Sequence, residues 1–159
     1  MSAVAGVTAS KDQHWLSFHI SAQLYAAPLA DVSEVIRPGE LTPVPGAAAD
    51  LLGIRLLRGR IVPVLDGCLR LGLPVLPVAD PERIRVVMLS HGSHLVGLQV
   101  DDIGELLRID GGEIAPPPPG RASRPEDPVS GVLAWKGEFA ALLDIRRLCR
   151  LQQEGGDGA

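Results

Sequence analysis

Residues 31–37 read DVSEVIR, and residues 102–108 repeat this phrase as DIGELLR. Each position of the second copy is displaced by 71 from the first, as from 31 to 102. Apolar positions stay apolar, and the charged residues Asp31, Glu34 and Arg37 recur as Asp102, Glu105 and Arg108. The match indicates that one half of the chain is a diverged copy of the other.

A second match follows each copy of the phrase. Gly53, Gly59, Leu65 and Asp66 correspond to Gly131, Gly137, Leu143 and Asp144, displaced by 78 as from 53 to 131. The offset grows by seven where residues 116–128, PPPPGRASRPEDP, have the proline-rich, polar composition of a surface loop. Two matches in the same order, with the length difference in a loop, predict an internal duplication and therefore two similar β-lobes.

Composition favours the same fold class. The chain has 159 residues, about the length of one compact domain. Hydrophobic residues make up 46% but aromatic ones only 3%, so the core must consist of Val, Leu, Ile and Ala. With 18 Gly and 14 Pro, we expect many short strands joined by tight turns and few long helices.

Alternation of apolar and polar residues predicts the individual elements. Asp31 has the character of a helix N-cap, and Glu34 stands at the capping-box spacing, so a capped turn is expected to run into a short strand. The remaining expected elements are strands over 15–20, 24–29, 83–90 and 95–101, hairpins over 51–66 and 131–144, and one C-terminal helix over 145–153.

Several classes of function have no support in the sequence. The formal net charge of −4 argues against nucleic acid as a partner. Cys68 and Cys149 are too few for a disulfide framework, which is typical of a reducing cytoplasm. The four histidines, His14, His19, His91 and His94, have no spacing typical of a metal site or a catalytic constellation. Nucleotide-binding and common hydrolase motifs are absent, so neither an enzyme nor a cofactor is predicted.

The two ends of the chain differ from the rest. Residues 1–13 lack the basic and apolar regions of a signal peptide, and residues 151–159 are rich in Gly and polar residues, so both are predicted to be disordered tails. No stretch has the 18 to 20 apolar residues of a membrane span, and no direct membrane insertion is expected.

The most prominent charged feature is a group of three arginines, Arg55, Arg58 and Arg60, around one hairpin turn. Three guanidinium groups at one turn suit a carboxylate or a phosphate, so a small ligand-binding regulator is one hypothesis. Arg58 could instead form an ion pair with Glu34. Both alternatives stay open at this point.

The blocks YAAPLADVSEV, LTPVPG, LLGIRLLRGRIVPVLD and LVGLQVDDIGELL, followed by the proline run, together resemble the CheW family of chemotaxis coupling proteins. The resemblance spans about residues 14–150. Its most specific part is a G-x-x-x-x-R-G-x-[IV]-V-P-[IV]-[LIV]-D motif, which Gly53 begins and Asp66 ends.

The resemblance implies a non-catalytic adaptor of two SH3-like, five-stranded β-barrel lobes packed together, with short helical turns and a C-terminal helix. We place lobe one at about 14–78 and lobe two at about 84–150, and allow for the exchange of a terminal strand between them. The implied partners are the regulatory domain of a CheA-type histidine kinase and the signalling tip of a methyl-accepting chemoreceptor. The implied location is cytoplasmic, in receptor arrays at the inner face of the membrane.

The resemblance also implies a protein-binding site, into which the receptor's helical hairpin would fit between the lobes. Two departures from the family pattern bear on partner choice: Leu56 replaces the usual Asn, and Gly67-Cys68 replaces the usual Leu-Arg. A coupler of a non-flagellar pathway, such as pilus motility, is therefore an alternative to a flagellar one. The site residues carried over are Val32, Glu34, Gly53, Arg58, Ile61, Gly97, Ile103 and Leu106.

Overall fold

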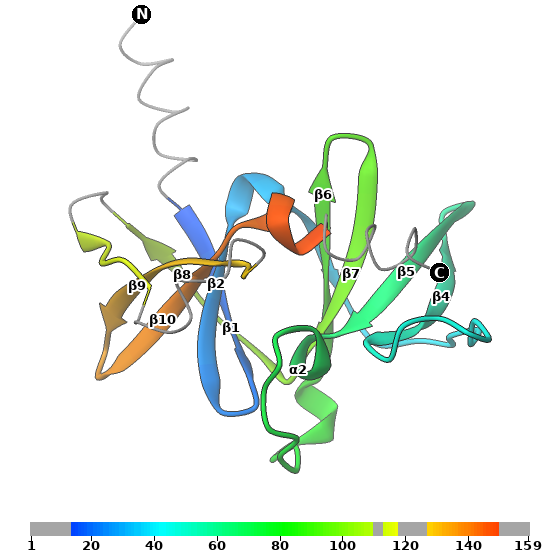
Figure 1. The fold of residues 1–159 in the computed structure, drawn as a ribbon, viewed down its shortest axis with the longest axis horizontal. Coiled ribbons are helices and arrows are strands. Elements are labelled where there is room, and N and C mark those ends of the chain that lie inside the picture. The colour runs from blue at the N-terminus through cyan, green and yellow to red at the C-terminus, as the bar shows by residue number, and fades with distance from the viewer. Residues whose placement is uncertain (1–13, 110–112, 118–126, 150–159) are drawn as a thin grey trace, which may run out of the picture.

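Two five-stranded sheets lie side by side in the computed structural model, which describes residues 14–109, 113–117 and 127–149 (Figure 1). One sheet has the order β8-β1-β2-β10-β9, formed by β1 (His14–Ile20), β2 (Gln23–Pro28), β8 (Asp102–Arg108), β9 (Val129–Trp135) and β10 (Glu138–Leu143). We call it sheet A. The other, sheet B, has the order β3-β6-β7-β5-β4, formed by β3 (Val32–Ile36), β4 (Leu51–Leu57), β5 (Arg60–Asp66), β6 (Arg85–His91) and β7 (His94–Val100).

Helical structure is short. It consists of η1 (Leu29–Asp31), α2 (Gly67–Arg70), η2 (Pro81–Arg83) and a helical turn over residues 145–149. The mainly β prediction is confirmed, and the predicted C-terminal helix is confirmed over 145–149, while its remaining residues and both predicted tails lie outside the described ranges. Among the described residues, no helix has the length and apolar character needed to cross a membrane.

The topology is that of a duplicated unit whose two copies exchange strands. β1 to β5 correspond in order to β6 to β10, but each sheet combines the first two strands of one copy with the last three of the other. In both sheets the two parts meet in a parallel pair, β2 with β10 and β5 with β7. The lobe boundaries at about 14–78 and 84–150 therefore do not match the sheets. The hairpin that begins each copy, β1–β2 or β6–β7, belongs to the sheet formed mainly by the other copy. A whole hairpin is therefore exchanged in each direction, and not the single terminal strand we allowed for.

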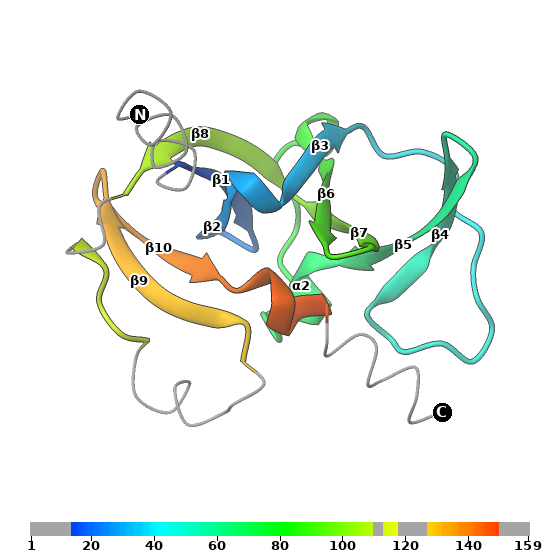
Figure 2. The ribbon, with the colours of Figure 1, turned by 90° about the horizontal axis from the view of Figure 1, so that it is seen from above.

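The repeated phrase provides the two strands that cross between the sheets. β3 follows the β1–β2 hairpin of sheet A but pairs with β6 in sheet B, and β8 follows the β6–β7 hairpin of sheet B but pairs with β1 in sheet A. Seen from above, the two crossing strands run along the same long side of the molecule (Figure 2). The sequence is repeated because the same crossing is made twice.

The predicted capping box is wrong. Asp31 ends the short helix η1 instead of beginning one, and the N-cap is Pro28, which makes no side-chain hydrogen bond there. Glu34 lies within β3 and uses its carboxylate elsewhere, as described below. The spacing of an acid three residues after an Asp is common to capped turns and to strands, so it could not separate the two.

Three hydrophobic clusters form the core. The largest combines residues of both sheets, among them Phe18 and Tyr25 from sheet A and Val87 and Leu98 from sheet B, each fully buried. The second lies within sheet A around Leu107 and Leu142, and the third within sheet B around Val62, Val64 and Met88. The shared cluster holds the two sheets together as one folding unit, because neither sheet can bury its side of that cluster alone.

In each sheet, the segment that follows the crossing strand at one edge forms a backbone bridge to the strand at the other edge. Thr42 forms an isolated bridge with Ile54 of β4, and Ala115 forms the corresponding bridge with Val132 of β9. Gly53 makes the first bridge possible, since a Cβ at this position would lie 2.8 Å from the Thr42 carbonyl oxygen. Gly131 allows the corresponding approach in sheet A, where a Cβ would lie 3.1 Å from the Ala115 carbonyl oxygen.

We expect Gly53→Ala to lower the free energy of unfolding more than Gly59→Ala, measured by urea denaturation. Both positions have positive φ, which costs an alanine about 1 kcal/mol, but only Gly53 would also force its Cβ against backbone, for a total of about 2–4 kcal/mol. Nothing lies within 4 Å of a Cβ at Gly59. Equal losses for the two variants would show that the close approach does not matter.

Candidate protein-binding site

An ion pair connects the crossing strand β3 to the β4–β5 turn at the opposite edge of sheet B. The two terminal guanidinium nitrogens of Arg58, Nη1 and Nη2, donate to the Glu34 carboxylate, with Nη2 2.6 Å from Oε1. The turn places Arg58 at φ +50° and Gly59 at φ +77°, the left-handed conformation of a two-residue hairpin turn. The ion pair predicted from sequence is therefore formed. The Arg58 side chain is 68% exposed and the Glu34 side chain 27%, so the pair lies at the surface of the molecule.

The duplication builds the same ion pair a second time. Lys136, at φ +46° in the β9–β10 turn, donates from Nζ to both carboxylate oxygens of Glu105, at 2.8 and 2.7 Å. Glu105 lies on β8, the other crossing strand. The two offsets of 71 and 78 could have predicted this pair, because they relate Glu34 to Glu105 and Arg58 to Lys136. Sequence reasoning matched the residues but missed the contact.

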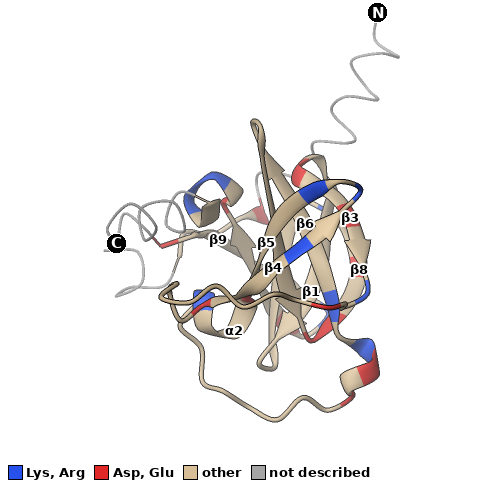
Figure 3. Cartoon of the chain, turned by 90° about the vertical axis from the view of Figure 1, so that its right-hand side faces the viewer, with Lys and Arg blue, Asp and Glu red and all other residues tan. Residues whose placement is uncertain are grey.

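The first of these pairs changes the acidity of its members. The hydrogen bond from Arg58 lowers the pKa of Glu34 below its usual value, and the same bond raises the pKa of Arg58. Both partners are thus charged at neutral pH, and the pair fixes the tip of the β4–β5 hairpin over the edge of β3. The basic residues of this hairpin are seen in Figure 3, which faces sheet B.

The three arginines of this hairpin do not converge on one anion site. Arg55 Nη1 donates to the Arg37 carbonyl at 3.0 Å, and Arg60 Nη2 donates to the Ser93 carbonyl at 2.7 Å. Since Arg58 is bound to Glu34, each guanidinium group has its own protein acceptor. This geometry gives no support to the hypothesis of a small ligand-binding regulator.

The apolar residues of the predicted site divide into two groups. Val32 on β3 and Ile103 on β8, which the duplication relates, are partly buried against the shared core at the junction of the sheets. Leu106 on β8 and Ile61 on β5 instead extend into solvent, with 52% and 68% of their surface exposed. Only the second group offers a partner a large apolar contact, while the first shapes the junction.

Both glycines of the predicted site are buried and have a structural role. Gly53 permits the close approach described above. Gly97 on β7 lies between two valines, and a Cβ there would be 2.7 Å from Val86 Cγ1 and 3.3 Å from Val64 Cγ2. Six of the eight predicted residues, Val32, Glu34, Gly53, Arg58, Ile61 and Gly97, belong to sheet B or its hairpin turn, while Ile103 and Leu106 belong to sheet A.

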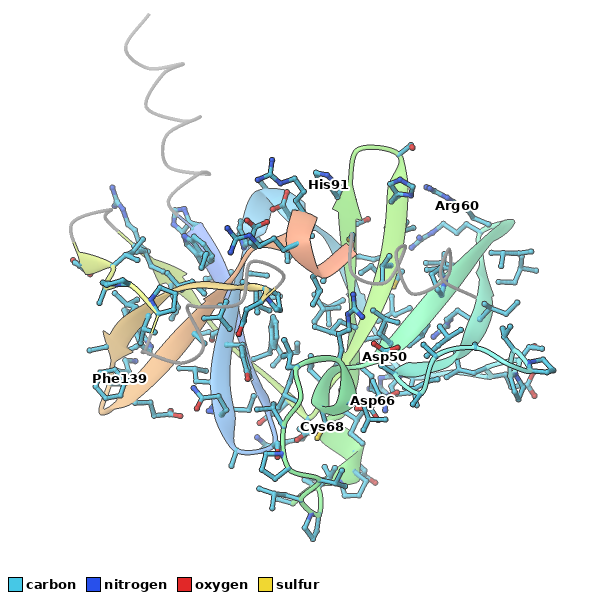
Figure 4. The ribbon with its side chains drawn as sticks, in the orientation of Figure 1. Asp50, Arg60, Asp66, Cys68, His91 and Phe139 are labelled. Carbon is cyan, nitrogen blue, oxygen red and sulfur yellow. The ribbon has the colours of Figure 1, made fainter. Side chains whose placement is uncertain are left out.

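Two exposed apolar residues were not among the predicted site residues, although Leu56 had been noted as a departure from the family pattern. Leu56, 71% exposed, is the cross-strand partner of Ile61, so the pair forms an apolar patch on the outer side of the hairpin. Phe139, 68% exposed, stands at the position of sheet A that corresponds to Ile61, and it lies on the opposite side of the molecule from Arg60 (Figure 4). The offset of 78 from 61 to 139 was the available signal.

Phe139 and Ile61 line surface pockets at corresponding places of the two sheets. The pocket of sheet A, about 380 Å³, is mostly apolar, and Phe139, Tyr25 and Val132 contribute to its wall. The pocket of sheet B, about 330 Å³, includes Ile61 but also the polar Arg60 and His94. The duplicated fold therefore presents two surfaces of related shape and different chemistry.

The described residues form neither a metal site nor an activated thiol. Within the described ranges, no cluster of three or more His, Cys, Asp or Glu side chains has the arrangement of a metal site. Cys68 and Cys149 are both free thiols, and burial raises the pKa of each. Neither thiol is thus activated as a nucleophile.

The ion pair of Glu34 predicts a pH dependence. Because its folded-state pKa is lowered, Glu34 should contribute stability above its ordinary value of 4.5, and this contribution should be lost as the pH falls through the folded-state pKa. The difference in free energy of unfolding between wild type and Glu34→Gln should therefore shrink below pH 4.5, and also with added salt. Urea denaturation over a pH series measures it. In an Arg58→Met background the difference should not depend on pH in this way.

Comparison with known proteins agrees with this fold. The family model for the CheW-like domain matches residues 14–153. A chemotaxis protein CheW of Rhizobium meliloti (strain 1021) is 29% identical over 131 residues, 82% of this chain and 83% of the relative, and a protein PilI of Pseudomonas aeruginosa is 31% identical over 103 residues, 62% of this chain and 57% of the relative. The crystal structure of the scaffolding protein TtCheW from Thermoanaerobacter tengcongensis superimposes with a TM-score of 0.76 at 26% identity, covering 86% of this chain and 87% of that one. The chain is a member of the CheW-like domain family.

Proposed function

We propose that this chain couples a CheA-type histidine kinase to the cytoplasmic signalling tips of chemoreceptors. Its family consists of scaffold and adaptor proteins of chemotaxis signalling and is not a catalytic one, so the chain is a chemotaxis adaptor. The proposal adds the two partners and the surface that binds them. The location we propose is the cytoplasm, in arrays at the inner face of the membrane.

One observation carries the proposal. The two crossing strands leave apolar side chains in solvent at corresponding positions, Val35 on β3 at 38% and Leu106 on β8 at 52% exposure. The residue before each in the chain is a carboxylate held by a basic residue of the neighbouring hairpin turn, Glu34 by Arg58 and Glu105 by Lys136. Successive side chains of a strand point to opposite faces, so each ion pair lies on the other face of the crossing strand from its exposed apolar residue. An exposed apolar strand suits the apolar face of an amphipathic helix, and the charges across the strand suit the polar flanks of that helix.

The kinase needs a surface of its own, since an adaptor must hold both partners at once. The outer side of the β4–β5 hairpin is suited to this, because Leu56 and Ile61 form an apolar patch there. Weak, exchangeable contacts are expected from patches of this size. We assign the crossing strands to the receptor and this hairpin to the kinase.

A coupler of a non-flagellar chemosensory pathway is the second candidate. The likeness to PilI favours it, together with Leu56, which stands where the family usually has Asn. Leu56 is 71% exposed and contributes nothing to the core, so the departure affects what the surface binds and not the fold.

We expect Leu106→Asp to reduce co-sedimentation with receptor signalling tips at least about tenfold, because a charge would replace an exposed apolar contact. Arg58→Ala should weaken assembly less, since it removes a rim charge and frees the hairpin tip. Circular dichroism should show the wild-type fold for both variants.

Val75→Asp is the matched control. Val75 is 77% exposed in the loop between α2 and η2, outside the proposed surface, so this variant should assemble like the wild type. If wild-type protein binds neither receptor tips nor the kinase regulatory domain, the proposed function is wrong. If Leu106→Asp and Val75→Asp behave alike, only the assignment of the surface is wrong.

Leu56→Asn tests the role of the departure from the family pattern. The free energy of unfolding should change by less than about 0.5 kcal/mol, as for other exposed sites. Calorimetry should measure the affinity for the kinase regulatory domain of one flagellar and of one non-flagellar pathway. We expect the ratio of these two affinities to differ between Leu56→Asn and the wild type. An unchanged ratio would show that Leu56 does not determine partner choice.

A further inference from the structure

A largely buried ion pair lies at the junction between the two sheets. Arg70, the last residue of α2, donates from Nη1 to Asp50 Oδ2 at 2.8 Å. The two side chains are only 9% and 15% exposed. Figure 4 shows Asp50 beside α2, in the middle of the molecule and away from both hairpin turns.

The same guanidinium group also reaches across to the other half of the molecule. Arg70 Nη2 donates to the Leu148 carbonyl at 2.7 Å. Leu148 lies in the helical turn 145–149, which follows β10 of sheet A, whereas α2 follows β5 of sheet B. The side chain of Arg70 therefore bonds at once to Asp50, which precedes β4 of sheet B, and to Leu148, which follows β10 of sheet A.

The duplication shows that this contact is specific to one half. α2 and the turn 145–149 correspond, with Asp66 and Asp144 bonded alike to the backbone N–H groups of Leu69 and Arg147, each at 3.2 Å. The displacement of 78 relates Arg70 to Leu148 and Asp50 to Pro128. Where one copy has an arginine and its carboxylate, the other has two residues without charge, so the pair was gained or kept by one copy only.

Stability alone is a poor reason to keep this pair. Within the described residues, Asp50 Oδ1 and Arg70 Nε are buried and have no hydrogen-bond partner. Removing charges from water costs more than an incompletely bonded pair regains, and apolar replacements of similar size are often neutral or stabilising. The pair instead fixes an orientation, because the planar guanidinium group holds its two acceptors, the Asp50 carboxylate and the Leu148 carbonyl, in a defined geometry.

We propose that Arg70 is a positioning residue that fixes sheet A relative to sheet B. It thereby sets the spacing between the crossing strands β3 and β8, whose exposed residues form the receptor surface. The apolar cluster at the junction holds the sheets together, but apolar contacts are not directional and permit small rotations. The first statement stands on the structure alone, and only the consequence for receptor binding rests on the proposed function.

The test replaces both charges together with apolar residues, in Asp50→Leu/Arg70→Met. Spin labels at the exposed positions Ser93 of sheet B and Ala134 of sheet A, with Cys68→Ser and Cys149→Ala, report the distance between the sheets by pulsed electron paramagnetic resonance. We expect an unchanged or higher melting temperature, a clearly broader distance distribution, and about tenfold weaker binding of receptor tips.

Arg147→Met is the matched control. Arg147 also contacts a carboxylate and a carbonyl, Asp144 at 3.6 Å and Asp127 at 3.3 Å, but both belong to its own half of the molecule. This variant should keep the wild-type distance distribution and the wild-type affinity. If it broadens the distribution as much as the double variant does, the effect is not specific to Arg70 and the proposal fails.

Arg70→Lys keeps the test decisive if the double variant does not fold. Lysine retains the positive charge next to Asp50 but lacks the planar fork that reaches two acceptors, so the distance distribution should still broaden. A wild-type distribution in a folded double variant, or in Arg70→Lys, would overturn the proposal. If the variants broaden the distance distribution but the wild-type protein binds no receptor tips, the role of Arg70 stands and the proposed function is wrong.

Discussion

The exchange of strands between two copies of one unit is the constraint on which this structure depends. Each sheet takes a hairpin from one copy and three strands from the other, so neither half of the chain can complete a sheet by itself. The backbone hydrogen bonds of β3 and β8 are made only when both halves are present. The largest core cluster then forms between the two sheets, and the protein folds as one unit although it contains two similar parts.

Duplication followed by divergence gave this adaptor two related surfaces. Both crossing strands carry an exposed apolar residue beside a carboxylate, and both hairpin turns hold that carboxylate with a basic residue. The details differ: Ile61 faces Leu56 on one sheet, whereas Phe139 faces Ala134 on the other. A protein that must hold two different partners needs surfaces that share a backbone and differ in side chains, and this fold provides them without catalytic chemistry.

The junction between the sheets combines two kinds of interaction with different consequences. Its apolar cluster supplies most of the stabilisation, since it removes large side chains such as Phe18 and Leu98 from water. Arg70 and Asp50 instead fix the orientation of one sheet relative to the other, at some cost in desolvation. An adaptor that transmits the state of a receptor depends on the relative placement of its binding surfaces, so directional contacts at this junction have a functional value that a stability measurement would not reveal.

The sequence by itself determined the β class, the duplication and both hairpins with their turns at Arg58-Gly59 and Lys136-Gly137. These follow from local patterns, from the conformational demands of tight turns, and from two copies that can be compared with each other. Only the tertiary structure decided which hairpin joins which sheet, because a strand presents the same alternation to any neighbour. It also decided which apolar residues are exposed, as with Val32 and Leu106, and it brought Arg70 to Leu148, since contacts between residues far apart in the chain leave no periodic signal.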